Sequence, residues 1–154
     1  MLAKTASEVL KNREFVSVAT CDLNNRPNAA SKFILKVEGS FIFLVDYTFG
    51  RSYENLKVNP RVSLSFVNTE NLKAYQITGS VELIESGPVY DGIAAELVNK
   101  EVSLSTDRII KGVSSGKRHE NFEVAIPEKF VIFKVKIEEA AEMPYGGGIK
   151  REKA

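Results

Sequence analysis

Residues 46–61 read DYTFGRSYENLKVNPR and lie between two apolar runs, FIFLV at Phe41–Val45 and VSLSF at Val62–Phe66. This order is typical of a strand, a polar turn, one short helix and a second strand. Gly50, Arg51 and Ser52 stand where the helix begins. A helix start offers unpaired N–H groups and a partial positive charge, so an added guanidinium and hydroxyl suit a phosphate. The same residue types also cap helices and solvate turns, and local chemistry leaves both interpretations open.

Length and composition indicate one soluble globular domain. The chain has 154 residues, of which 44% are apolar and 27% charged, and this is too apolar for a disordered protein. The formal net charge of +1 gives no electrostatic footprint for nucleic acid or for an anionic membrane. Any anion must therefore be bound by a local site.

Cysteine usage and hydropathy indicate a cytoplasmic protein. Cys21 is the only cysteine, so it forms no internal disulfide and no thiolate cluster, and a reducing compartment is favoured. Met1–Arg13 has the pattern of a short amphipathic helix rather than of a signal peptide. No run approaches the roughly 20 apolar residues that span a bilayer.

The rest of the chain alternates short strand patterns with turn chemistry, which favours a barrel over a parallel sheet. Gly79 interrupts the longest strand pattern, as a bulge would. A helix is expected at Pro88–Val102, a helical turn within Asp107–Gly112 and a loop at Ser114–His119. The expected strands are Phe15–Thr20, Asn28–Val37, Phe41–Val45, Arg61–Val67, Leu72–Glu85 and Phe130–Ile137. We expect residues 1–143 to form this one domain and residues 144–154 to form a flexible, glycine-rich tail.

No self-sufficient catalytic constellation is present. His119 is the only histidine, so a histidine metal site is excluded, and its polar loop favours a solvated side chain. Cys21 at a strand end is typical of a small buried apolar group. Glu138, Glu139 and Glu142 have the pattern of a solvated patch, and Tyr145 with its glycines of a flexible terminus rather than a lid. Because no Walker, Rossmann or nucleophile-elbow motif occurs, a bound cofactor would have to carry any chemistry.

The succession of motifs between about Glu8 and Glu85 resembles the pyridoxamine 5'-phosphate oxidase-like flavin proteins. The spacing from the turn through Asn55-Leu56 to Asn59-Pro60-Arg61-Val62 is the most specific part of this resemblance. The motifs are, in order, FVSVAT at Phe15–Thr20, RPNAA at Arg26–Ala30, Phe41–Val45, Arg51-Ser52, Asn55-Leu56, NPRV at Asn59–Val62, and Gly79.

The resemblance implies a mainly β fold with flanking helices, a six-stranded antiparallel split β-barrel of the FMN-binding type. It also implies a homodimer with FMN at the subunit interface. By the family pattern, the flavin ring is lined by Ala30, Ser31, Lys32 and Phe33, further contacts come from Val45, Asp46, Tyr47 and Thr48, and the phosphate is held by Arg51 and Ser52. Lys32 could stabilise a reduced, anionic flavin or point into water. Phe33 could pack on the flavin ring or belong to the core.

The departures from the family pattern argue against a vitamin B6 oxidase. The oxidases carry an Arg-to-Lys pair across the second strand, where this chain has Ala30 and Leu35. The usual Ser-Arg-Lys turn is replaced by Gly50-Arg51-Ser52, which removes one phosphate cation. Ala74 stands where the family has a glutamine, and Gln76 could substitute for it. The substrate-binding C-terminal segment of the oxidases has no counterpart.

Three hypotheses follow from the resemblance. The first is an FMN-dependent oxidoreductase that passes electrons or hydride from NADH or NADPH to an unidentified acceptor. The second is a non-enzymatic FMN-binding redox carrier or sensor, because no proton-transfer residue stands beside the proposed ring. The third is a relative that binds deazaflavin or haem, or that has lost its ligand, although His119 in its loop is a poor haem ligand.

Overall fold

The computed structural model describes residues 1–116 and 129–154. The chain divides into two compact units, one of residues 1–84 with 130–154 and one of residues 85–129. The second unit contains α3 (Pro88–Ser114). The first unit contains every other helix and strand that the structure describes, and with them the ten residues predicted to contact a cofactor.

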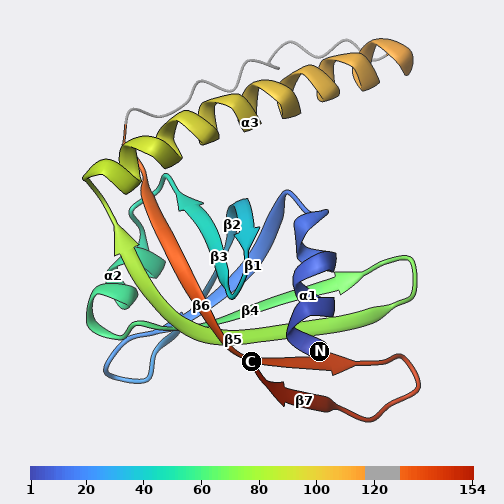
Figure 1. The fold of residues 1–154 in the computed structure, drawn as a ribbon. Coiled ribbons are helices and arrows are strands. Elements are labelled where there is room, and N and C mark those ends of the chain that lie inside the picture. The colour runs from blue at the N-terminus through green and yellow to red at the C-terminus, as the bar shows by residue number, and fades with distance from the viewer. Residues whose placement is uncertain (117–128) are drawn as a thin grey trace. The chain divides into compact units, whose positions relative to one another are not determined.

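Six antiparallel strands of the first unit form a closed barrel, as predicted (Figure 1). Neighbouring strands pair in the order β3-β2-β1-β4-β5-β6, and pairing of β3 with β6 closes the sheet. Their bounds are β1 (Phe15–Cys21), β2 (Pro27–Glu38), β3 (Phe41–Asp46), β4 (Arg61–Asn68), β5 (Lys73–Ile84) and β6 (Val131–Met143). Two helices accompany them, α1 (Leu2–Lys11) and α2 (Arg51–Val58).

The barrel core follows from the period-two alternation of the strands. Val16 and Val18 on β1 are buried, whereas the alternate residues Phe15, Ser17 and Ala19 are exposed, because successive side chains point to opposite faces. α1 adds Ala6 and Leu10 to the same core. The alternation in β5 predicts that Tyr75, Ile77, Val81 and Leu83 share one face. The first three are buried and Leu83 is half-buried, as an inner face requires.

Gly79 is required where β5 bends against β6. The pairing register shifts between Thr78 and Gly79, which confirms the predicted bulge. A Cβ atom at Gly79 would lie 2.0 Å from the backbone oxygen of Lys136. Backbone atoms cannot yield as a flexible side chain would, so this close approach admits glycine alone.

The structure corrects the end of the last barrel strand. β6 begins at Val131 and continues to Met143, whereas the sequence predicted a strand at Phe130–Ile137. Glu142 is buried and does not belong to a solvated patch, because its Oε2 accepts hydrogen bonds from the Tyr75 hydroxyl (3.2 Å) and from Lys73 Nζ (3.4 Å). Burial and the neighbouring Glu142 carboxylate raise the pKa of Tyr75.

One further element was not predicted, and another is longer than predicted. β7 (Lys150–Lys153) pairs with β6 through residues 139–142. It lies within the stretch expected to be a tail, and a strand of four charged residues carries no apolar alternation by which it could be recognised. α3 continues past the predicted end at Val102 and includes Asp107–Gly112 as regular helix. The domain boundary at residue 143 stays a prediction.

No helix in residues 1–116 or 129–154 has the length and hydropathy needed to cross a membrane. His119 lies outside the described residues, and its loop setting stays a prediction.

Replacing Gly79 by Ala tests the close approach of β5 to β6. We expect Gly79→Ala to lower the free energy of unfolding by about 1–3 kcal/mol, because the added methyl group must displace the Lys136 carbonyl. Gly92→Ala is the matched control, since Gly92 lies in α3 with no atom within 4 Å of the added Cβ. That control should keep or raise stability. Urea unfolding of both variants measures the difference, and equal stabilities would contradict the account.

Candidate cofactor-binding site

The turn between β3 and α2 leaves the start of the helix open. Gly50 is the N-cap residue of α2, and no side chain caps the helix. The Thr48 hydroxyl, the nearest candidate, donates instead to Asp46 Oδ1 at 2.8 Å. Phe49 has a positive φ of 48°, unusual for a large side chain, and its ring meets the Tyr53 ring edge-on with centroids 5.1 Å apart. The first backbone N–H groups of α2 are therefore available to an acceptor from outside.

Two asparagines of the Asn55-Leu56 and Asn59-Pro60 motif fix α2 on the barrel. The Asn55 side-chain amide donates to Thr20 Oγ1 at 3.0 Å, and both residues are buried. The Asn59 amide donates to the Cys21 backbone oxygen at 3.1 Å. Since both contacts reach the end of β1, the middle and the C-terminal end of α2 are held against the barrel wall.

Arg51 is exposed and stands at the open helix start. Among the described residues its guanidinium makes no hydrogen bond and no ion pair. It lines a cavity of about 420 Å³ together with Asp22, Arg26, Phe49, Gly50, Glu54 and Asn55. The positive N-terminal end of α2 and the Arg51 guanidinium thus border the same space.

The other charges around this cavity are already paired. Asp22 Oδ2 accepts from Arg26 Nε at 2.8 Å, and Glu54 pairs with Lys57 at 2.9 Å. Hydrogen bonds from the backbone N–H of Arg26, from its side chain and from Asn24 lower the pKa of Asp22. Arg51 is therefore the one cation lining this described cavity that lacks a counterion.

Ser52 does not share this cavity with Arg51. Its side chain is buried, and its Oγ accepts a hydrogen bond from the Asn28 side-chain amide at 3.0 Å. This contact ties α2 to β2. The two residues predicted to hold a phosphate are adjacent in sequence, but the structure directs them to different surroundings.

Lys32 and Asp46 form a buried ion pair at the junction of β2, β3 and the turn. Lys32 Nζ lies 2.8 Å from Asp46 Oδ1, and the two side chains are 5% and 1% exposed. The same oxygen accepts from the Thr48 backbone N–H at 3.2 Å and from its hydroxyl at 2.8 Å. Lys32 therefore does not point into water, which removes one of its two considered roles. The other carboxylate oxygen, Asp46 Oδ2, is buried and has no hydrogen-bond partner among the described residues.

The remaining predicted contacts lie along the same two strand ends. Phe33 on β2 is paired with Val45 on β3, both are buried, and the Phe33 ring meets Phe15 edge-on at 5.8 Å. Ser31 is exposed and Ala30 half-buried, and the Tyr47 ring lies edge-on to Phe130 at 6.2 Å. Of the ten predicted residues, the structure joins Lys32 with Asp46 and pairs Phe33 with Val45. Their contact with a cofactor stays a prediction.

Sequence reasoning missed several residues of this region. Asp22 and Arg26 line the cavity, and Asn28 holds Ser52, although all three belong to the β1–β2 hairpin. Both strands of this hairpin were predicted, but no sequence signal placed the hairpin against α2. The positive φ of Phe49 also has no signature in the sequence.

Breaking the Lys32–Asp46 pair on one side should destabilise the fold. We expect Asp46→Asn to cost about 3–5 kcal/mol in unfolding free energy, because Lys32 is left buried without a counterion. The double variant Lys32→Met with Asp46→Leu should recover most of this loss, since an apolar pair needs no desolvation of charge. Urea unfolding measures both. A loss below about 1 kcal/mol for Asp46→Asn would show a solvated pair and contradict the burial.

Comparison with known proteins identifies the family. The family model described as pyridoxamine 5'-phosphate oxidase matches residues 2–143. The chain belongs to this family. Membership agrees with the barrel topology and with the order of motifs around the β3–α2 turn.

The relatives are distant, and their similarity to this chain is mostly one of fold. An uncharacterised protein of Methanocaldococcus jannaschii is 29% identical over 101 residues, which are 62% of this chain and 66% of that protein. A Clostridium acetobutylicum protein related to general stress protein 26 of B. subtilis has a TM-score of 0.64 at 18% identity, over 99% of this chain and 94% of the other. An FMN-binding, pyridoxamine 5'-phosphate oxidase-related protein of Nostoc punctiforme has a TM-score of 0.58 at 10% identity, over 99% and 93%.

Other proteins with this fold are named for different cofactors. An F420 reductase has a TM-score of 0.56 at 17% identity, over 87% of this chain and 94% of the other. HutZ, a haem storage protein from Vibrio cholerae, has a TM-score of 0.62 at 19% identity, over 96% of both chains. Proteins with this fold thus include ones named for flavin, F420 and haem, and the cofactor of this chain must be argued from its own residues.

Proposed function

We propose that this chain binds FMN through its phosphate at Arg51 and acts as an oxidoreductase between a nicotinamide donor and an acceptor still to be found. The observation that carries the proposal is the unpaired Arg51 guanidinium at the uncapped start of α2. A guanidinium offers paired, planar donors that match phosphate oxygens, and the adjacent helix N–H groups add more.

The charge of the cavity suits one phosphate group. Asp22 and Glu54 flank Arg51, and each is already paired with another cation. A phosphate monoester therefore meets one free cation and a helix start, whereas a diphosphate would bring further negative charge near two carboxylates. This balance favours FMN over a dinucleotide. Ser52, buried against Asn28, serves in this proposal to hold α2 rather than to touch phosphate.

The strand ends beside the turn supply the proposed ring contacts, Ala30–Phe33 and Val45–Thr48. Bound FMN supplies two-electron redox chemistry at its ring. The chain's own contribution is positional, because Asp46 fixes Lys32 on β2 and Thr48 in the turn at the same time. Lys32 enters the site with its charge balanced, so it contributes less to an anionic ring than a free lysine would.

A second candidate is a non-enzymatic FMN-binding carrier or sensor. The buried Lys32–Asp46 ion pair favours it. The ammonium of Lys32 and the carboxylate of Asp46 are buried and bonded to each other. Each is therefore engaged by the other rather than presented to a substrate, whereas many oxidoreductases need a general acid or base beside the substrate. Anaerobic addition of NADH or NADPH separates the candidates, since bleaching of the flavin band requires a hydride donor to reach the ring.

A homodimer with FMN between the copies, in the cytoplasm, completes the proposal. The outer face of β1 and β2 supports the homodimer. The exposed residues there have small side chains that project little from the sheet, namely Ser17, Ala19, Ala29 and Ser31. Phe15 at the edge of this face is 49% exposed. A second copy could approach the sheet closely there and bury that ring.

Arg51→Ala tests the phosphate contact. We expect it to weaken FMN binding roughly ten- to hundredfold and riboflavin binding little, because only FMN carries the phosphate. Arg26→Ala is the matched control, since Arg26 lines the same cavity but is paired with Asp22. Quenching of flavin fluorescence on binding measures the dissociation constants of FMN and of riboflavin. Equal weakening of FMN and riboflavin by Arg51→Ala would refute the phosphate assignment.

A further inference from the structure

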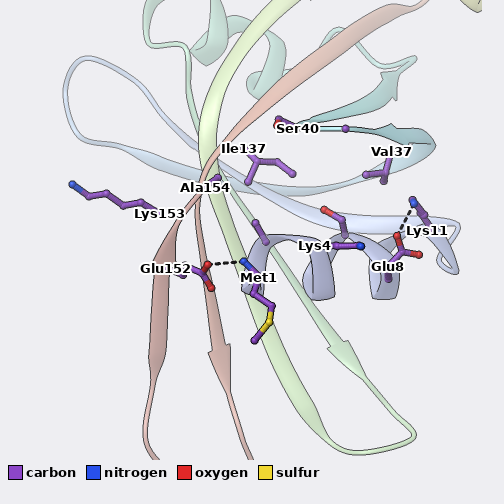
Figure 2. Close-up of a pocket in the computed structure, with 13 residues that line it drawn as sticks. Met1, Lys4, Glu8, Lys11, Val37, Ser40, Ile137, Glu152, Lys153 and Ala154 are labelled. Atoms are coloured by element: carbon purple, nitrogen blue, oxygen red, sulfur yellow. Dashed lines mark hydrogen bonds and ion pairs between the residues drawn. The ribbon is translucent and has the colours of Figure 1, made fainter.

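A second cavity, of about 520 Å³, lies between α1, the β2–β3 turn and β7 (Figure 2). It shares no residue with the cavity beside Arg51. Its volume falls within the range of about 300–1,000 Å³ that is usual for small-molecule sites. Its apolar wall includes Ala3 on α1, Val37 on β2 and Ile137 on β6. Figure 2 shows the side chains of Val37 and Ile137 above α1, with open space between them.

α1 presents two unused donors to this cavity. Ser7 is 6% exposed, and its hydroxyl makes no hydrogen bond to any described residue. Ser7 lines the cavity, so its hydroxyl is available to donate to an acceptor there. Lys4 lies three residues earlier on the same helix face and also lines the cavity. Its ammonium has no ion pair within the described part of the chain.

The two side-chain carboxylates of the lining, Glu8 and Glu152, leave Lys4 available. Glu8 Oε1 pairs with Lys11 Nζ at 2.7 Å. Glu152 on β7 accepts from the Met1 amine at 2.6 Å and from the Leu2 backbone N–H at 2.7 Å. Because Glu8 and Glu152 are each engaged by another donor, neither neutralises Lys4. The remaining cation of the lining, Lys153, extends away from Lys4, Val37 and Ile137 (Figure 2).

We infer that this cavity binds a small aliphatic carboxylate. The carboxylate oxygens would accept from the Lys4 ammonium and the Ser7 hydroxyl, and the aliphatic chain would lie against Val37 and Ile137. One ammonium and one hydroxyl match the two oxygens of a monoanion. A phosphate dianion would favour a guanidinium or two converging cations, and here the lining has no arginine while the Lys153 side chain extends away from Lys4 (Figure 2). The inference does not depend on FMN binding.

A titration with octanoate, monitored by the NMR chemical shifts of backbone amides, tests the site. We expect saturable shifts at Ser7 and Val37 in the wild-type protein. Lys4→Met should weaken octanoate roughly tenfold or more, and Ser7→Ala about three- to tenfold. Ser7→Ala should not lower the stability of the protein, since the hydroxyl has no internal bond to lose. Lys153→Met is the matched control and should change the affinity less than about twofold.

Three results would overturn the inference. One is the absence of saturable shifts at Ser7 and Val37 with millimolar octanoate. Another is octanol binding as tightly as octanoate, which would show an apolar hollow without recognition of charge. The third is equal affinity of Lys4→Met and the wild-type protein.

Discussion

The pairing of β6 with both β3 and β5 is the constraint on which the rest of the structure depends. This double pairing closes a twisted antiparallel sheet into a barrel. Gly79 allows the closure, because its missing side chain lets β5 approach the β6 backbone at the bend. Asp46 is the last β3 residue in this pairing, opposite Val131. Closure thereby buries Asp46 together with Lys32. In water, such a pair would contribute about 1 kcal/mol or less, whereas a buried pair ties its elements together because separating it exposes an uncompensated charge.

Much of the barrel could be predicted because its strands alternate and its turns carry recognisable chemistry. The β3–α2–β4 order, the bulge at Gly79 and the inner face of β5 all follow from local patterns. The end of β6 could not be predicted, because Glu142 looks solvated unless its hydrogen bond to Tyr75 is known. β7 has no apolar residue, so only its pairing with β6 reveals it.

The family resemblance names positions for the candidate site, but it does not give the contacts that these residues make. Lys32 and Asp46 were both named from the family pattern, but their bond joins residues 14 apart and depends on closure of the sheet. Arg51 and Ser52 were assigned one role. The structure separates them, with Arg51 free at the helix start and Ser52 bonded to Asn28 on another strand. Where the family pattern has a second cation, this chain therefore has a tether between α2 and β2.

The absorption spectrum of the protein purified without added cofactor, with mass identification of any released chromophore, tests the central claim most directly. Our account predicts the two visible bands of oxidised flavin and release of FMN. A Soret band with released haem, a deazaflavin chromophore, or colourless protein that takes up no FMN on addition would contradict it.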